Sequence, residues 1–245
     1  MQKIIIFIYG ILAYVIFLIA FLYAIGFVGN FLVPKGIDAG EALSFSYSLI
    51  INLGLLSLFA IQHSVMARPA FKKWWTARIG VAAERSTYVL LSSLALLLLY
   101  WQWQPMTAVV WEIEHAVLSK ILLGIFALGW IIVFLATFMI NHFELFGLLQ
   151  IFNNLKNKTA APSKFQINFF YTLVRHPIML GFLIAFWATP YMTVGHLLFA
   201  TVTTIYILIA VKYLEEKDLR NALGERYAQY QKEVPMLIPF TKKRP

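Results

Sequence analysis

Five long apolar segments constrain this chain more than any other feature of its sequence. A bilayer crossing requires roughly 20 apolar residues in helical conformation, because lipid offers no partner for unpaired backbone groups. Most of the five reach or approach that length, and short polar connections separate them. They cover Ile4–Phe27, Ser44–Met66, Tyr88–Trp103, Val117–Ile140 and His196–Tyr213. The sequence therefore predicts an all-α fold, a polytopic transmembrane helix bundle.

A sixth apolar segment, Ile178–Thr189, is too short for a full crossing at about 1.5 Å per residue. Pro190 ends it, and Gly195 precedes the fifth long segment. We expect four full crossings, followed by a C-terminal helical hairpin made of the sixth segment and the last long one. The charged stretch from Glu215 to Tyr230 is then expected to form a cytoplasmic tail helix.

The basic residues are distributed unevenly between the two predicted faces. Of the 20 lysines and arginines, all but Lys35 and Lys120 lie in alternate connections or near the termini. This is the positive-inside pattern, which places both termini in the cytoplasm and requires an even number of crossings. The net charge of +9 therefore records orientation, and we expect membrane lipid, not nucleic acid, as a partner. No obligate protein partner is indicated, and residues 1–245 are expected to form one integral-membrane domain.

Several chemistries lack their motifs. The chain has no cysteine, which excludes disulfides, thiolate nucleophiles and cysteine-based metal sites. It has no Gly-x-Gly-x-x-Gly, P-loop or Gly-x-Ser-x-Gly pattern, so nucleotide-binding sheets, phosphoryl-transfer loops and serine hydrolases are not supported. His63, His142 and His176 could bind a metal or haem, but no His-x-x-x-His or His-Glu-x-x-His pair is present. We predict no metal site.

The predicted orientation brings polar residues from several segment ends to the same depth, the cytoplasmic rim of the bundle. Ionisable residues are costly beside lipid and often mark a functional site there. Each also has a structural interpretation, as an interface hydrogen bond, a local ion pair or a solvated surface helix. The residues concerned are Gln62, His63, Glu84, Arg85, Asn141, His142, Arg175, His176, Glu215 and Glu216. We expect their side chains to line one cavity.

The stretch from Tyr171 to Gly181 places Arg175, His176 and Pro177 directly before an apolar helix. Proline suits the first helical turn, and the next N–H groups lack intrahelical partners, so they suit a carboxylate or phosphate. A carboxylate pair, Glu215–Glu216, follows downstream. This combination suits a zwitterionic cofactor, with its carboxylate near Arg175 and its ammonium or ribose near Glu215 or Glu216. The cofactor-binding part is expected at about 141–240.

The pattern Arg175-His176-Pro177, Gly181, Glu215-Glu216 and Tyr227-x-x-Tyr230 resembles the isoprenylcysteine carboxyl methyltransferase superfamily of membrane enzymes. A second resemblance, to the bacterial methanethiol S-methyltransferases, extends over nearly the whole chain. It is carried by 21–34, 62–69, 84–88 and 141–143. These resemblances imply a bacterial inner (cytoplasmic) membrane, S-adenosyl-L-methionine as donor, S-adenosylhomocysteine as product and a small thiol as acceptor. Met179 stands where many relatives carry tyrosine, so that tyrosine contact is not carried over.

The resemblance also implies roles for individual residues. His63 and His142 are candidates for base or proton relay, because imidazole titrates near neutral pH. Asn141 and Tyr88 would orient them. At the cofactor, Arg175 would clamp the carboxylate and His176 would contact the amino-acid end. Tyr227 and Tyr230, or the loop Gly147–Gln166, would supply an apolar slot for adenine.

Two other functions stay open at this point. The same scaffold could methylate a prenylated cysteine carboxylate or an amine-bearing phospholipid, which would require an opening toward the lipid. Alternatively, a non-enzymatic membrane subunit could use His63, His142 and His176 to handle haem or quinone.

Overall fold

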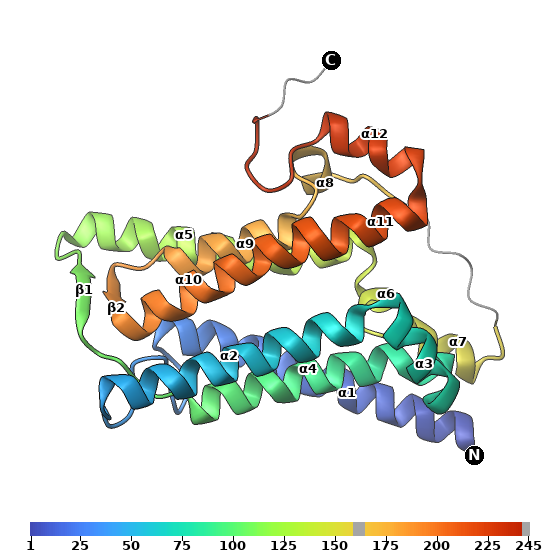
Figure 1. The fold of residues 1–245 in the computed structure, drawn as a ribbon, viewed down its shortest axis with the longest axis horizontal. Helices are drawn as coiled ribbons and strands as arrows, with labels where there is room; N and C mark the ends of the chain where they lie inside the picture. The colour runs from blue at the N-terminus through green and yellow to red at the C-terminus, as the bar shows by residue number, and fades with distance from the viewer. Residues whose placement is uncertain (159–164, 242–245) are drawn as a thin grey trace. The chain divides into compact units, whose positions relative to one another are not determined.

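The computed structural model describes residues 1–158 and 165–241, and its helices and strands are labelled in Figure 1. These residues form two compact units, which are described separately below. Unit 1 comprises Met1–Ala108, His142–Pro162 and Thr193–His196. Unit 2 comprises Val109–Asn141, Ser163–Met192 and Leu197–Pro245. Helices dominate both units, and the described ranges contain one two-stranded sheet.

Unit 1 is built on three long helices. These are α1 (Gln2–Gly29), α2 (Phe45–Ala67) and α4 (Val81–Gln102), and both α1 and α2 pack against α4. The short helix α3 (Pro69–Ile79) connects α2 to α4 and begins at a proline. Two further short helices, α6 (His142–Leu145) and α7 (Leu148–Leu155), complete the unit. α7 packs on α1 and α4 and buries Ile151 completely.

Unit 2 is centred on α5 (Ala116–Ile140) and α9 (Pro177–Trp187), which pack closely against each other. Glycine is required at their crossing. A Cβ atom at Gly129 would lie 2.8 Å from the carbonyl oxygen of Gly181, and one at Gly181 would lie 2.7 Å from that of Gly129. The other elements are α8 (Phe170–Leu173), β1 (Val109–Glu112), β2 (Tyr191–Thr193), α10 (Val194–Ile209), the π-helical segment Ala210–Glu215, α11 (Glu216–Leu223) and α12 (Glu225–Glu233). The first three residues of α10 belong to unit 1.

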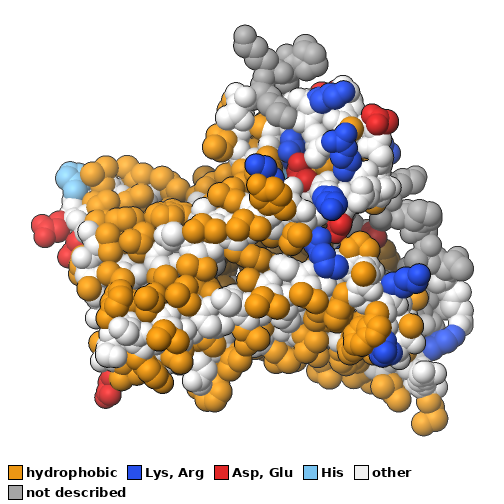
Figure 2. Space-filling view, in the orientation of Figure 1, with side chains coloured by type: hydrophobic (Ala, Val, Ile, Leu, Met, Phe, Trp, Pro, Cys, Tyr) orange, Lys and Arg blue, Asp and Glu red, His pale blue; other side chains and the backbone are white. Residues whose placement is uncertain are grey.

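Five helices of the described residues are long and apolar enough to cross a membrane. They are α1, α2, α4, α5 and the continuous helix Val194–Leu223. Their outward faces carry many exposed large apolar side chains, such as Ile5, Ile50 and Ile121, and Figure 2 shows hydrophobic atoms along them. A water-soluble chain rarely exposes such continuous apolar surface. The chain is therefore a multi-pass membrane protein, and the predicted all-α bundle is confirmed at that level; the number of crossings stays a prediction.

The structure changes several predicted boundaries. α4 begins at Val81, seven residues before the predicted Tyr88, because Ala82, Ala83 and Glu84 favour a helix without being part of an apolar run. The tail stretch Glu215–Tyr230 is not one separate helix. Its first half continues the last long helix, and Gly224, at φ 59°, interrupts the helix before α12 begins. In the loop Gly147–Gln166, residues 148–155 form α7, and 159–164 lie outside the described residues.

Candidate functional site

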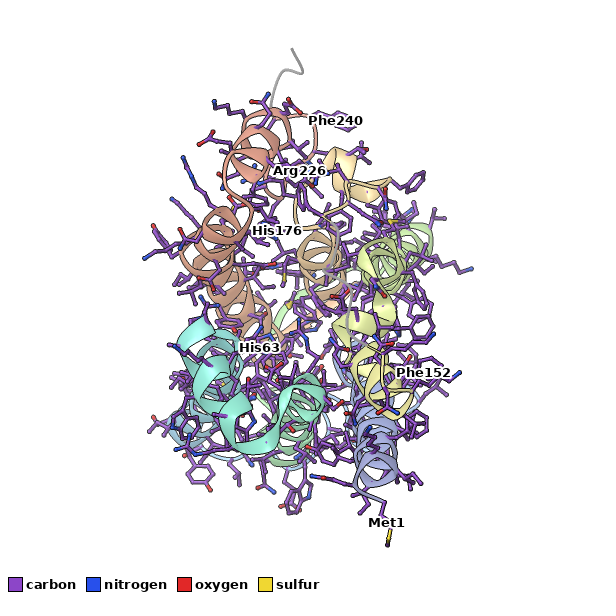
Figure 3. The ribbon with its side chains drawn as sticks, turned by 90° about the vertical axis from the view of Figure 1, so that its right-hand side faces the viewer. Met1, His63, Phe152, His176, Arg226 and Phe240 are labelled. Carbon is purple, nitrogen blue, oxygen red and sulfur yellow. The ribbon has the colours of Figure 1, made fainter. Side chains whose placement is uncertain are left out.

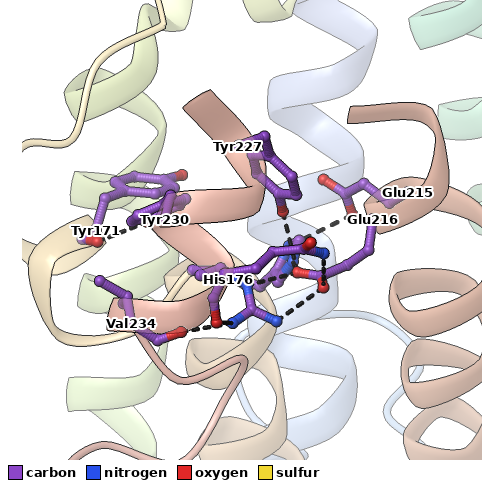
Figure 4. A network of polar contacts seen from close by, with 9 residues as sticks. Tyr171, His176, Glu215, Glu216, Tyr227, Tyr230 and Val234 are labelled. Carbon is purple, nitrogen blue, oxygen red and sulfur yellow. Dashed lines mark hydrogen bonds and ion pairs between the residues drawn. The ribbon is translucent and has the colours of Figure 1, made fainter. Parts of the chain in front are cut away.

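A buried network in unit 2 joins Arg175 to Glu216 (Figure 4). Arg175 Nε donates to Glu216 Oε1 and Nη2 donates to Oε2, each over 2.7 Å, which is the bidentate geometry of a strong charge-assisted pair. Arg175 Nη1 also donates to the carbonyl oxygens of Gln231 and Val234. Four of the five guanidinium N–H groups therefore have acceptors within the described part of the chain.

His176 lies between the two acidic side chains of the same network. Its Nε2 is 2.9 Å from Oε1 of Glu216, and its Nδ1 is 3.6 Å from Oε2 of Glu215. Burial by itself lowers the pKa of His176, but hydrogen bonding and the charges of Glu215 and Glu216 outweigh it and raise this pKa to about 9. His176 is therefore an imidazolium at neutral pH and is not available as a base. The side chain of Glu215 is 45% exposed, against 10% for Glu216, so Glu215 is the accessible acid of the pair.

Two tyrosines connect this network to residues 227–236, called the C-terminal segment below. Tyr227 donates to Glu216 Oε1 over 3.0 Å, and Tyr230 donates to the carbonyl oxygen of Tyr171 over 2.6 Å. Burial and the charge of Glu216 raise the pKa of Tyr227, so its hydroxyl stays a donor. Tyr227, Tyr230 and Val234 also form a small apolar core with Phe165, Leu219 and Leu223.

Backbone hydrogen bonds complete the attachment of the C-terminal segment. The N–H groups of Arg175 and His176 donate to the carbonyl oxygens of Pro235 and Met236, over 2.9 and 3.2 Å. The sequence around Arg175 and residues 234–236 are thus held together by both side chains and backbone.

The two glutamates reach His176 from a helix with unusual geometry. The last long helix is π-helical over Ala210–Glu215, immediately before Glu216. Consecutive α-helical side chains diverge by about 100°, whereas a π segment changes the helical phase and is often found at functional sites. Here the π segment ends at Glu215, where the carboxylates of Glu215 and Glu216 lie close to the two ring nitrogens of His176.

Pro177 and Gly181 occupy structural positions on α9. Pro177 is the first residue of the helix, as predicted, and it is buried. Gly181 lies at the crossing with α5, where its contact is with Gly129. This packing gives a reason for glycine at position 181; cofactor binding by Pro177 and Gly181 stays a prediction.

In unit 1, His63 lies on α2 (Figure 3), and its ring is hydrogen-bonded to side chains of α4. Tyr88 Oη lies 2.8 Å from His63 Nε2, and Ser92 Oγ lies 3.2 Å from Nδ1. The ring of Phe59 stacks on the imidazole at 5.2 Å. The contact between Tyr88 and His63 that an orienting role requires is therefore present, although the role itself stays a prediction.

His142 begins α6 and is only 3% exposed. Tyr14 Oη, from the middle of α1, lies 2.7 Å from His142 Nε2. Burial lowers the pKa of His142, so its ring is neutral at pH 7. Sequence analysis missed Tyr14, since a tyrosine in an apolar run looks like a lipid-facing residue. The available signal was a hydroxyl in the middle of a predicted span, where an unpaired polar group is costly.

The predicted site residues fall into two groups. Unit 1 holds His63, Tyr88 and His142, whereas the other nine belong to unit 2. Asn141 ends α5 in the left-handed conformation, at φ 113°. The single rim cavity expected to include residues of both units stays a prediction. Among the described residues, no three His, Asp or Glu side chains are grouped so that they would hold a metal ion.

Fold and site together define a class: a multi-pass helical membrane protein with a buried Arg–Glu–His network near its C-terminus and two histidine–tyrosine pairs. Comparison with known proteins specifies it further. The family described as NnrU protein matches residues 51–231, and the chain belongs to that family.

Relatives with assigned names match over most of the chain. Methanethiol S-methyltransferase 1 of Bradyrhizobium diazoefficiens is 54% identical over 240 residues, covering 98% of this chain and 84% of that protein. Methanethiol S-methyltransferase of Mycobacterium tuberculosis is 52% identical over 240 residues, covering 98% of each. Nurim of Bos taurus is 32% identical over 181 residues, covering 70% of this chain and 68% of that protein. No solved structure matches the chain.

Proposed function

We propose that this chain methylates methanethiol to dimethyl sulfide, with S-adenosyl-L-methionine as the methyl donor. The observation that carries the proposal is the 52% identity to a methanethiol S-methyltransferase over 98% of both chains. In the reaction a carbon–sulfur bond forms to the thiol, the donor's carbon–sulfur bond breaks with its electron pair staying on S-adenosylhomocysteine, and the thiol proton passes to a base. The protein must orient the thiol, exclude water and accept that proton.

The unit 1 histidines are our candidates for the proton acceptor. A small alkanethiol is mostly protonated at neutral pH, while the thiolate is the effective nucleophile. A base must therefore be neutral before the reaction. Burial keeps the pKa of His142 low, whereas the pKa of about 9 at His176 makes that residue unsuitable. We assign the proton to His142 or His63, with Tyr88 orienting His63 and Asn141 near His142 in the sequence.

The unit 2 network is our candidate for binding the donor. Glu215 offers a half-exposed carboxylate for the ammonium or ribose hydroxyls, and the His176 imidazolium pairs with that carboxylate. Glu216, which is itself paired with Arg175, would hold the His176 ring in place. A direct clamp by Arg175 on the donor carboxylate would use its remaining N–H or exchange a bond with Glu216. The first-turn N–H groups after Pro177 and the rings of Tyr227 and Tyr230 would complete the site.

We also propose a membrane topology. Helices α1, α2, α4 and α5 each cross the bacterial inner membrane, and α9 and α10 form a hairpin, because α9 has only 11 residues. The rings of Phe186 on α9 and Phe199 on α10 pack at 5.0 Å, which supports the hairpin. The distribution of lysine and arginine then places both termini and α12 in the cytoplasm. The whole chain would act as one membrane enzyme.

The test is a headspace assay for dimethyl sulfide with purified protein, methanethiol and S-adenosyl-L-methionine. His142→Ala is expected to lower kcat, and Glu215→Gln is expected to raise the KM for the donor. Glu225→Gln is the matched control, because Glu225 is an exposed acid at the start of α12. Activity and both effects, with an unchanged control, would support the assignment.

Two results would overturn the proposal. Methylation of a prenylated cysteine or a phospholipid without formation of dimethyl sulfide would favour the sister enzymes on this scaffold. A Soret band in the purified protein, together with no binding of S-adenosylhomocysteine, would favour a haem-handling subunit.

A further inference from the structure

Unit 2 exposes large apolar side chains in two short segments that lie outside its membrane-length helices. The first segment, residues 167–173, includes α8 and exposes Ile167, Phe169 and Leu173. The second, residues 238–240, follows the C-terminal segment and exposes Ile238 and Phe240. Phe169 is 70% exposed and Phe240 is 86% exposed, and Figure 3 shows the side chain of Phe240 projecting outward. Apolar surface of this kind marks contact with a membrane or another protein.

The first segment lies against the end of α5. Asn168 Nδ2 donates to the carbonyl oxygen of Met139 over 3.3 Å, and Tyr171 Oη donates to that of Ala136 over 3.5 Å. α5 is one of the membrane-length helices, and Phe138, in this same part of it, is also exposed. The exposed side chains of the first segment are therefore next to a helix surface that faces lipid, which favours lipid over a protein as their partner.

Basic residues accompany the second segment. Lys242, Lys243 and Arg244 follow Phe240 almost directly in the sequence. Bulky apolar side chains beside clustered lysine and arginine are typical of segments that bind at the boundary between the headgroups and acyl chains of an anionic membrane. The charges and the apolar side chains thus favour the same partner, an anionic lipid surface.

The backbone at both phenylalanines supports a position in the membrane surface. Phe169 has φ 41° and Phe240 has φ 63°, values that are uncommon for bulky residues and unfavourable in free energy. A ring that projects into water gains no burial to offset this cost. A ring that enters a bilayer does, because its apolar surface leaves water.

We propose that the two segments insert their apolar side chains into the surface of the membrane, with anionic phospholipid as the preferred lipid. Arg175 and His176 follow the first segment, and Pro235 and Met236, to which their N–H groups donate, precede the second. Insertion of both segments therefore holds the network of Arg175 and Glu216 at a fixed depth, close to the lipid headgroups. The inference concerns lipid binding and does not rest on methyl transfer.

Fluorescence from single cysteines tests the insertion, because the chain has no cysteine of its own. Phe169→Cys and Phe240→Cys are labelled with the environment-sensitive dye NBD, in nanodiscs that hold one protein in a mixture of phosphatidylcholine and phosphatidylglycerol. Both are expected to emit at shorter wavelength than Glu225→Cys, the matched control at an exposed acid of α12, and to be quenched by doxyl-labelled lipid. Ile131→Cys, at an exposed position of α5, gives the signal of a lipid-facing site. If Phe169→Cys fails to fold, Ile167→Cys reports on the same segment.

The lipid preference is tested in nanodiscs of phosphatidylcholine alone. Quenching at position 240 is expected to be weaker there, and replacement of Lys242, Lys243 and Arg244 by glutamine is expected to abolish the difference between the two lipid compositions. Equal quenching in both compositions, with the three basic residues in place, would overturn the preference for anionic lipid.

Two results would overturn the insertion itself. Water-like emission at either phenylalanine position, equal to that of Glu225→Cys, would show that the segment is solvated. Emission at shorter wavelength without quenching by doxyl-labelled lipid would show that protein covers the ring instead. Neither result bears on the proposed function, which the headspace assay for dimethyl sulfide tests separately.

Discussion

Arg175 and Glu216 are joined by two hydrogen bonds of 2.7 Å across 41 positions of sequence. Both residues are buried, and Glu216 also accepts from His176, Tyr227 and Gln231. A buried ion pair is tolerated when its charges are fully hydrogen-bonded, and removal of one partner leaves the other uncompensated. The Arg-His-Pro sequence thus has a structural role in addition to any contact with a ligand, because it anchors the C-terminal segment.

Glu216→Gln is therefore expected to destabilise the protein by about 3–5 kcal/mol, because it leaves the Arg175 charge buried without a counter-charge. Thermal unfolding in detergent measures the effect. Glu225→Gln, at an exposed carboxylate, is expected to shift the melting temperature very little. Equal melting temperatures for Glu216→Gln and Glu225→Gln would contradict the anchoring role.

Stability is expected to fall as the pH rises from about 6.5 to about 9. The pKa of His176 is raised to about 9 in the folded protein, above its unfolded value of about 6.5. A raised pKa stabilises the fold at pH values below the unfolded pKa, and this contribution is lost as the pH passes the folded pKa; it is on the order of 3 kcal/mol. Unfolding midpoints measured across this range should show the slope in the wild type and a flatter profile in His176→Gln. A wild-type profile as flat as that of the variant would refute the prediction.

Gly181→Ala is expected to force α5 and α9 apart. Its Cβ would lie 2.7 Å from the carbonyl oxygen of Gly129 and from a methyl group of Val133. Overpacking of this kind costs roughly 1–3 kcal/mol. Gly124→Ala, also on α5, is the control, since its Cβ would meet nothing within 4 Å. The melting temperature should fall for the first variant and stay level or rise slightly for the second; the reverse order would disprove the close crossing.

Asp38→Ala is expected to destabilise unit 1 by about 1–3 kcal/mol, because it leaves hydrogen-bonding groups without their acceptor. Asp38 accepts from Thr193 Oγ1 over 2.6 Å and from the side chain of Asn30. Thr193 Oγ1 also accepts from the N–H of His196, so the acid supports the first turn of α10. Glu41→Ala, an exposed acid nearby, serves as the comparison in the same unfolding assay. Similar losses in both variants would argue against a specific role for Asp38.

The natural absence of cysteine makes the topology directly testable. Single variants Glu114→Cys and Lys232→Cys place a thiol at exposed positions before α5 and on α12. With a membrane-impermeant maleimide applied to spheroplasts, Glu114→Cys is expected to react and Lys232→Cys only after lysis. Labelling of Lys232→Cys in intact spheroplasts would contradict the proposed orientation.

The helices were predictable because their signal is local. The apolar runs Ile4–Phe27, Ser44–Met66 and Val117–Ile140 each lie within an observed helix, apart from the N-cap Ser44. The short run Ile178–Thr189 corresponds to α9, which Pro177 begins. The ends were less predictable, since helix formers such as those of Glu216–Leu223 extend a helix beyond its apolar part.

Pairings between distant residues were harder to predict. The Arg-His-Pro and Glu-Glu motifs drew attention to Arg175 and Glu216, yet their pairing with each other was not foreseen, because each was interpreted as a contact for a ligand. Tyr14 and Asp38 carry no local motif at all, and their partners lie 128 and 155 positions away. The strand pair β1–β2 was also not predicted, because a strand of four residues is too short to show a clear alternation of apolar and polar side chains.

The π segment Ala210–Glu215 has a consequence for how this protein tolerates changes in length. A π segment takes up one extra residue in nearly the same rotation as a regular α-helix, so a single deletion there would restore regular winding and leave the helix downstream in nearly its present orientation. A single deletion in the α-helical part, Val194–Ile209, would instead rotate Glu215 and Glu216 by about 100° about the helix axis, away from His176. The π segment is therefore the place where this helix can lose one residue and still present its acidic pair to the histidine.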